Sequence, residues 1–104
     1  MVCEYQYHAF LPGVEPTRES ILHVIILEMF GKYKCSEEIS LSNAAEIIVG
    51  KNDFEWGLKD GEEVCILIRK KDNPEAIELF KVSVEMSIET TAHRMDYQNP
   101  FTAY

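Results

Sequence analysis

The strongest constraint on this chain is a pair of adjacent strand patterns in its second half. Residues 63–71 (EVCILIRKK) are apolar at every position from Val64 to Ile68, which is typical of a strand covered on both faces. Residues 78–90 instead alternate between apolar and polar side chains, the period of a half-buried strand. The apolar side of that second strand holds Phe80, Val82, Val84, Met86 and Ile88. The Asp-Asn-Pro turn chemistry between the two segments predicts an antiparallel hairpin.

A third strand is predicted near residues 2–11. The segment VCEYQYHAFL alternates with the same two-residue period, and Pro12-Gly13 ends it. Its apolar face holds Cys3, Tyr5, Tyr7, Ala9 and Leu11.

Residues 17–33 predict the first helix. Thr17 suits the N-cap, and Glu19 lies in the first turn, where the helix dipole favours an acid. One apolar stripe at helical spacing holds Leu22, Ile25, Ile26, Met29, Phe30 and Tyr33, and a second holds Ile21, Val24 and Leu27. So broad an apolar surface predicts a helix that is central or that contacts a second chain. The β-branched run Val24–Ile26 would also suit a strand.

A second, shorter helix is predicted over residues 43–50, with Asn43 and Glu46 as a capping-box-like pair and Gly50 as its stop. The chain is then a single α+β domain, residues 1–104, with a small antiparallel sheet and both helices on one face. The alternative is a winged helix, with the hairpin as the wing. Its third helix would fall on NDFEWGLKDGEE, which has two glycines and an excess of acids where a recognition helix needs basic residues.

Charge and cysteine content narrow the class of protein. The net charge is −8, from 18 acidic and 10 basic residues, which disfavours binding to nucleic-acid phosphates or anionic lipid. Three widely spaced cysteines, Cys3, Cys35 and Cys65, predict free thiols in a reducing compartment. No signal segment opens the chain, and no apolar run approaches the length of about 20 residues that spans a membrane. We therefore expect a cytoplasmic protein without a membrane segment.

No motif in the sequence predicts catalysis, a metal or a cofactor. An EF-hand loop beginning at Asp53 would have Leu58 in place of the turn glycine and Val64 in place of the bidentate Glu. The cysteines and histidines lack the short paired spacing of a zinc site. No nucleophile elbow and no glycine-rich phosphate loop occurs. We predict a protein that is not an enzyme and that holds neither metal nor cofactor.

The segment KNDFEWGLKDGEE, residues 51–63, combines two large aromatics with five carboxylates in a predicted loop. Eight acids and two bases lie between residues 35 and 66, a net charge of −6, so a negative patch is expected. The predicted partner-binding residues are Asp53, Phe54, Glu55, Trp56, Asp60, Glu62 and Glu63. Either the two aromatics pack beneath the loop and attach it to the core, or one of them stays exposed and fills a partner's pocket.

These observations predict a small acidic protein-interaction module of the inhibitor, immunity or adaptor type. Its carboxylates would pair with a basic surface of a protein partner and block it, including a surface that otherwise receives nucleic acid. The alternative is a small-molecule or ion-binding domain, or a non-catalytic enzyme subunit, with a pocket between sheet and helix near Tyr5, Tyr7, His8 and His93. The aromatic C-terminal tail, residues 92–104, together with the broad helix, predicts a homodimer.

Overall fold

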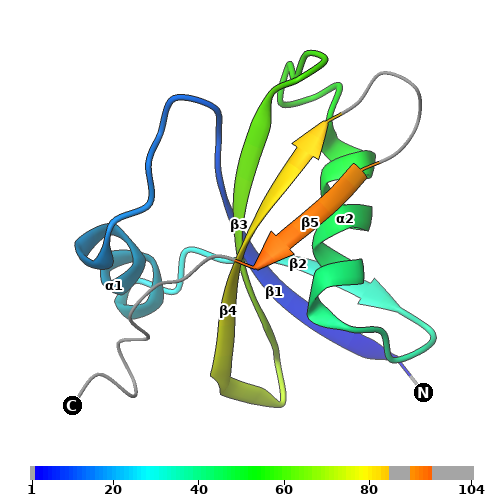
Figure 1. Cartoon of the computed structure of the whole chain (residues 1–104). Helices are drawn as coiled ribbons and strands as arrows, with labels where there is room; N and C mark the ends of the chain where they lie inside the picture. The colour runs from blue at the N-terminus through cyan, green and yellow to red at the C-terminus, as the bar shows by residue number, and fades with distance from the viewer. Residues whose placement is uncertain (1, 85–89, 95–104) are drawn as a thin grey trace.

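The computed structural model describes residues 2–84 and 90–94, which form a five-stranded sheet and two helices (Figure 1). The elements are β1 (Cys3–Phe10), α1 (Arg18–Ile26), β2 (Gly31–Cys35), α2 (Leu41–Asn52), β3 (Glu63–Lys70), β4 (Asn73–Val84) and β5 (Thr90–Arg94). Neither helix of this part of the chain is long and apolar enough to cross a bilayer.

The strands all pair antiparallel, in the order β2-β1-β3-β4-β5. This confirms the α+β fold class and the three predicted strands. The β3–β4 hairpin is also confirmed, with Val64 opposite Val82 and Leu67 opposite Leu79. The fully apolar β3 lies in the centre of the sheet, the position that its sequence predicts.

The strand β4 begins at Asn73 rather than near residue 78, because the hairpin turn needs only Lys71 and Asp72. Pro74 falls at the start of the strand, where its missing N–H is tolerated.

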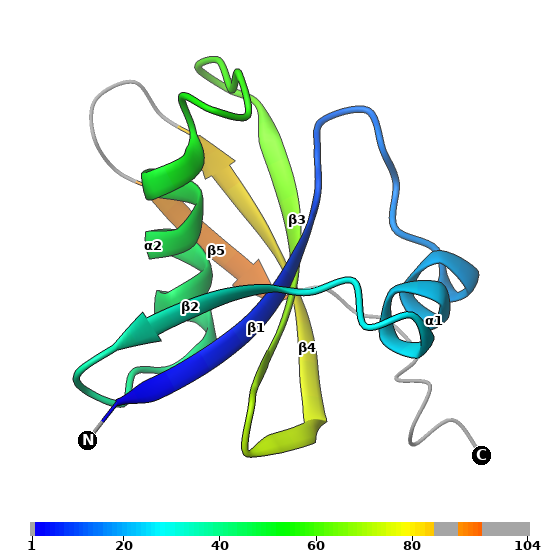
Figure 2. The same cartoon turned by 180° about the vertical axis from the view of Figure 1, so that it is seen from behind.

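The prediction that both helices lie on one face of the sheet is wrong. The helices α1 and α2 cover opposite faces (Figures 1 and 2). On β3, Val64, Ile66 and Ile68 point toward α2, whereas Cys65 and Leu67 point toward α1. Because β3 is apolar on both faces, each face needs its own helix to remove it from water.

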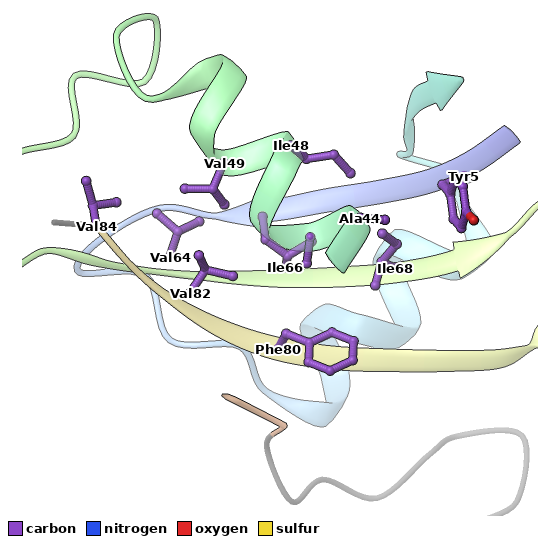
Figure 3. Close-up of a cluster of buried hydrophobic side chains, with 11 residues drawn as sticks. Tyr5, Ala44, Ile48, Val49, Val64, Ile66, Ile68, Phe80, Val82 and Val84 are labelled. Carbon is purple, nitrogen blue, oxygen red and sulfur yellow. The ribbon is translucent and has the colours of Figure 1, made fainter. Parts of the chain in front are cut away.

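The two faces therefore have separate cores, and the α2-side core is the larger (Figure 3). Its buried side chains are Tyr5, Ala44, Ala45, Ile48, Val49, Val64, Ile66, Ile68, Phe80, Val82 and Val84. The α1-side core consists of Phe10, Ile21, Val24, Cys65, Leu67, Ile77 and Leu79.

The helix α1 begins as predicted. The Thr17 side chain accepts the backbone N–H of Ser20 (3.1 Å), and the Ser20 hydroxyl oxygen accepts the backbone N–H of Thr17 (2.8 Å). This reciprocal capping box satisfies two backbone donors at the helix start. Glu19 occupies the first turn, as expected.

The prediction that this helix extends to residue 33 is wrong, because α1 ends at Ile26. Glu28 adopts a left-handed φ of 51°, and Met29 donates its backbone N–H to the carbonyl of Val24 (2.9 Å). This is a Schellman closure with a glutamate where glycine is usual. The chain then turns into β2, a strand that the sequence analysis missed.

The predicted apolar stripe of the first helix is also wrong. Ile21 and Val24 are the buried residues of α1, whereas Ile26, Leu27 and Met29 are exposed. A helix of little more than two turns buries only one narrow face against the sheet.

The helix α2 is longer than predicted, and its caps differ. Ser40 is the N-cap, with its hydroxyl oxygen accepting the backbone N–H of Asn43 (3.2 Å), so the expected Asn43 and Glu46 pair does not start the helix. Gly50 does not end the helix, which continues to Asn52. The first left-handed residue after α2 is Gly57 (φ 66°).

The strand predicted near 78–90 ends at Val84, and a separate strand, β5, pairs with β4 so that Thr90 lies opposite Val84. The predicted tail therefore begins with strand residues. Met86, Ile88 and the tail aromatics Tyr97, Phe101 and Tyr104 lie outside the described residues.

Candidate functional site

The predicted site is the loop that joins α2 to β3, residues 53–62, called here the acidic loop (top of Figure 1). It is tied to the end of β4 by two backbone hydrogen bonds. Gly61 donates to the carbonyl of Val84 (2.8 Å), and Val84 donates to the carbonyl of Glu62 (2.9 Å). The sheet therefore fixes the far end of the loop.

The first half of the acidic loop is a series of tight turns. The N–H of Trp56 donates to the carbonyl of Asn52 (2.9 Å), and the N–H of Leu58 donates to that of Asp53 (2.9 Å). Gly57 accepts the left-handed backbone conformation that closes this coil. Phe54 and Trp56 would share a face only in an extended segment, and this segment is coiled.

The two aromatic rings consequently have different surroundings. Trp56 is half-buried and packs with Leu58 against the α2-side core. Phe54 is 93% exposed, and it is the one exposed aromatic side chain within residues 2–84. Trp56 holds the loop to the domain, whereas Phe54 projects from it.

Several carboxylates of the acidic loop, and that of Glu63 directly after it, accept hydrogen bonds within the domain. Asp53 accepts the N–H of Phe54 (2.7 Å), Glu62 accepts the N–H of Lys59 (2.7 Å), and Glu63 accepts the hydroxyl of Ser83 (3.3 Å). Glu55 and Asp60 are exposed. The sequence does not distinguish among these acids. In the structure Asp53, Glu62 and Glu63 accept hydrogen bonds, and Glu55 is exposed beside Phe54.

The alternative pocket, predicted near Tyr5, Tyr7, His8 and His93, is not one site. Tyr5 belongs to the α2-side core, whereas His8 faces α1. His8 lines a groove of about 640 Å³ between β1 and α1, together with His23. The Nδ1 of His8 donates to the carbonyl of Met29 (2.9 Å). His93 lies in β5, opposite Lys81.

Three consecutive basic residues, Arg69, Lys70 and Lys71, lie at the end of β3 and in the turn after it, and their side chains have different surroundings. Arg69 is only 7% exposed; its Nε donates to Gln6 (2.8 Å), and its guanidinium lies 4.3 Å from the ring centre of Phe30. Burial lowers the pKa of Arg69. Lys70 pairs with Glu38, and this hydrogen bond lowers the pKa of the Glu38 carboxyl.

Neither a metal site nor a similarity to known proteins assigns a function to these regions. Within residues 2–84 and 90–94, no three His, Cys, Asp or Glu side chains gather closely enough to hold a metal ion. Comparisons of the chain with protein-family models, with curated proteins and with solved structures found no match.

Proposed function

We propose that this chain is a protein-interaction module that binds a basic surface of a protein partner through the outer side of the acidic loop. The observation that supports this proposal is the exposure of Phe54 on a loop that is otherwise fixed by hydrogen bonds and by Trp56. An exposed aromatic on a rigid support can enter a partner's pocket with little loss of conformational entropy.

The charge around Phe54 supports a basic target. Asp53 and Glu55 flank the ring in sequence, and the region from residue 35 to 66 carries most of the net charge of the chain. Such a charge distribution accelerates encounter with a positive surface and disfavours neutral or acidic partners.

The mechanism is occlusion, as expected of an inhibitor, immunity protein or adaptor. Phe54 fills a pocket on the target while Glu55 and neighbouring carboxylates pair with basic groups around it. A target surface that otherwise receives nucleic acid would suit these carboxylates, because its basic groups are spaced to meet phosphates. In this proposal Trp56 supports the loop and does not contact the partner.

The test is quantitative affinity capture from lysate of the source cells at low and moderate salt, read by mass spectrometry. The variants are Phe54→Ala and Glu55→Lys. The matched control is Ile26→Ala, which removes an apolar side chain that is 73% exposed on α1, away from the loop. Circular dichroism establishes that each variant is folded.

We expect Phe54→Ala to lower retention of a specific partner by about tenfold or more, as truncation of an interface anchor does. Glu55→Lys should also lower retention of the partner, and the loss should grow as the salt concentration is reduced, because the new positive charge repels a basic surface. Ile26→Ala should retain the partner. Equal capture by wild type and Phe54→Ala would contradict the proposal.

A second candidate function is supported by the groove between β1 and α1. Its volume of about 640 Å³ lies within the usual range for small-molecule sites, and His8 and His23 supply polar groups on an apolar wall. A small-molecule ligand of this groove would raise the melting temperature of wild type, and His23→Gln would reduce that rise. A screen in which His23→Gln leaves every ligand-induced shift unchanged would contradict this assignment.

A further inference from the structure

We propose that Cys3 and Cys35 form a redox-sensitive pair, which a low-molecular-weight disulfide oxidises to an intramolecular disulfide. The two residues lie directly opposite each other in the register of β1 and β2. Cross-strand partners share one face of a sheet, and both half-buried side chains pack against the α2-side core. Both thiols are free. The two cysteines are 32 positions apart in the sequence, and the pairing of β1 with β2 brings them together.

The backbone defines the type of this cross-strand pair. Glu4 accepts the N–H of Lys71, on the β3 side of β1 (3.0 Å). Backbone groups of successive strand residues point to alternate sides, so those of Cys3 point toward β2. Cys3 and Cys35 are then a hydrogen-bonded pair with Cα atoms about 5.5 Å apart, within the range that a disulfide spans.

Closing the bond requires a small approach of the two strands. Cβ atoms of a hydrogen-bonded cross-strand pair are about 5.5 Å apart, the long end of the usual range, and a disulfide needs about 4 Å. Cys3 begins β1, and Cys35 ends β2, which is an edge strand. Strand ends at a sheet edge can move more easily than the centre, so a reversible disulfide is favoured over a permanent one.

The surroundings distinguish the two thiols. Cys3 lines a groove of about 760 Å³, and Cys35 does not. The other groove residues are Val2, Glu4, Lys34, Glu38, Lys70, Lys71 and Asp72. The groove's three lysines are matched by three acids: Lys70 pairs with Glu38, and Lys34 and Lys71 lie 3.8 and 3.6 Å from Glu4. The groove therefore admits a small disulfide such as glutathione disulfide without selecting it by charge.

The reaction proceeds by two thiol–disulfide exchanges. The Cys3 thiolate attacks one sulfur of glutathione disulfide, forms a mixed disulfide and releases one glutathione thiolate. The Cys35 thiol, which donates to the carbonyl of Glu37 (2.9 Å), turns from it, loses its proton and attacks the Cys3 sulfur. The second glutathione thiolate leaves. The protein loses two electrons and two protons, and one glutathione disulfide becomes two glutathione thiols.

Cys65 provides an internal reference. It is buried in the α1-side core, and burial raises the pKa of its thiol. Its thiolate is therefore scarce and shielded from an incoming disulfide. The expected product retains Cys65 as a thiol.

The experiment incubates the full chain in glutathione redox buffers and measures intact mass, reactive thiols and linked tryptic peptides. We expect the mass to fall by two hydrogen atoms, the thiol count to fall from three to one, and a peptide pair joining Cys3 to Cys35. Oxidation should raise the melting temperature by about 5–10 °C, because the bond closes a long loop of the unfolded chain.

Three variants separate the roles of the thiols. Cys35→Ser should accumulate a glutathione adduct on Cys3, Cys3→Ser should react slowly, and Cys65→Ser should behave as wild type. The proposal is overturned if wild type accumulates only the adduct, forms disulfide-linked dimers, or leaves both thiols reduced in oxidising buffer. It is independent of the acidic loop, so partner binding by Phe54 can fail while this disulfide forms.

Discussion

The two helical layers of this protein differ in how completely they are packed. All four apolar residues of α2 at its sheet-facing side, Ala44, Ala45, Ile48 and Val49, are buried. The helix α1 buries only Ile21 and Val24 and leaves large apolar side chains exposed at its end. The α2 layer is also held at its two ends, by Tyr5 before the helix and by Trp56 after it.

This difference changes how an exposed apolar residue should be interpreted. At the end of α1, exposure accompanies a short helix with one narrow buried face, so it carries little functional information. Phe54 is exposed beside the well-packed α2 layer, within turns that position the neighbouring Trp56 inward. Exposure next to good packing, with Asp53 and Glu55 on either side in sequence, is the stronger indication of a binding surface.

The largest effect should come from the α2 layer. Ile48 is 1% exposed, so Ile48→Ala should lower the free energy of unfolding by about 3 kcal/mol through lost burial and a cavity. The matched variant, Ile26→Ala on α1, should change it by less than about 0.5 kcal/mol. Urea unfolding followed by circular dichroism measures both, and equal losses would erase the contrast between the layers.

The Tyr5 tether should have an intermediate effect. Its hydroxyl donates to the carbonyl of Ile39 (2.7 Å) and accepts the N–H of Ile39 (2.8 Å), which fixes the chain before α2. Tyr5→Phe leaves both backbone groups without this partner and should cost about 1–3 kcal/mol. A loss below about 0.5 kcal/mol in urea unfolding would show that this tether is dispensable.

The same residue predicts a dependence of stability on pH. Burial raises the pKa of Tyr5 above the ordinary value near 10, since it disfavours the ionised phenol. Its contribution is therefore fully present below about pH 10 and is lost as the pH rises through the raised folded-state pKa. Urea unfolding at pH values from 8 to 11 should show that the free energy of unfolding declines in wild type and declines less in Tyr5→Phe. Equal declines in the two proteins would show that ionisation of Tyr5 is not the cause.

The smallest predicted effect lies at the end of α1. Glu28 holds a left-handed backbone conformation (φ 51°), so Glu28→Gly should stabilise the protein by about 0.5–1 kcal/mol. Glu28 also interacts with Arg69 electrostatically, and Glu28→Ala separates the two contributions, because it removes the charge and keeps the strain. A gain with Ala as large as with Gly would show that strain is not the cause.

The strands with a clear two-residue period could be predicted from the sequence, because that period is local. The opposite placement of the helices was also implicit in β3, whose Val64–Ile68 run is apolar on both faces. The strand β2 could not be predicted, because Gly31–Cys35 continues an apparent helical stripe and the true helix stop is a glutamate rather than a glycine.

The position of the acidic loop in the chain and its charge could be predicted from the sequence, but the surroundings of its two aromatic rings could not. The acids of residues 53–63 are visible in the sequence, but the separation of Phe54 from Trp56 depends on how the loop coils. That coil results from backbone bonds to Asn52 and Asp53, and the far end of the loop is fixed by Val84, which is distant in sequence. Which aromatic is exposed is therefore a tertiary property.

The most direct test of the central claim replaces Phe54 with photoreactive benzoylphenylalanine and irradiates the protein in source-cell lysate. The same replacement at Ile26 serves as the control, because that position is exposed at the end of the other helical layer. The account predicts one dominant cross-linked protein with a basic surface at position 54, weakened by salt and absent at position 26. The same cross-links at both positions, or none at position 54, would contradict the claim that Phe54 is a binding anchor.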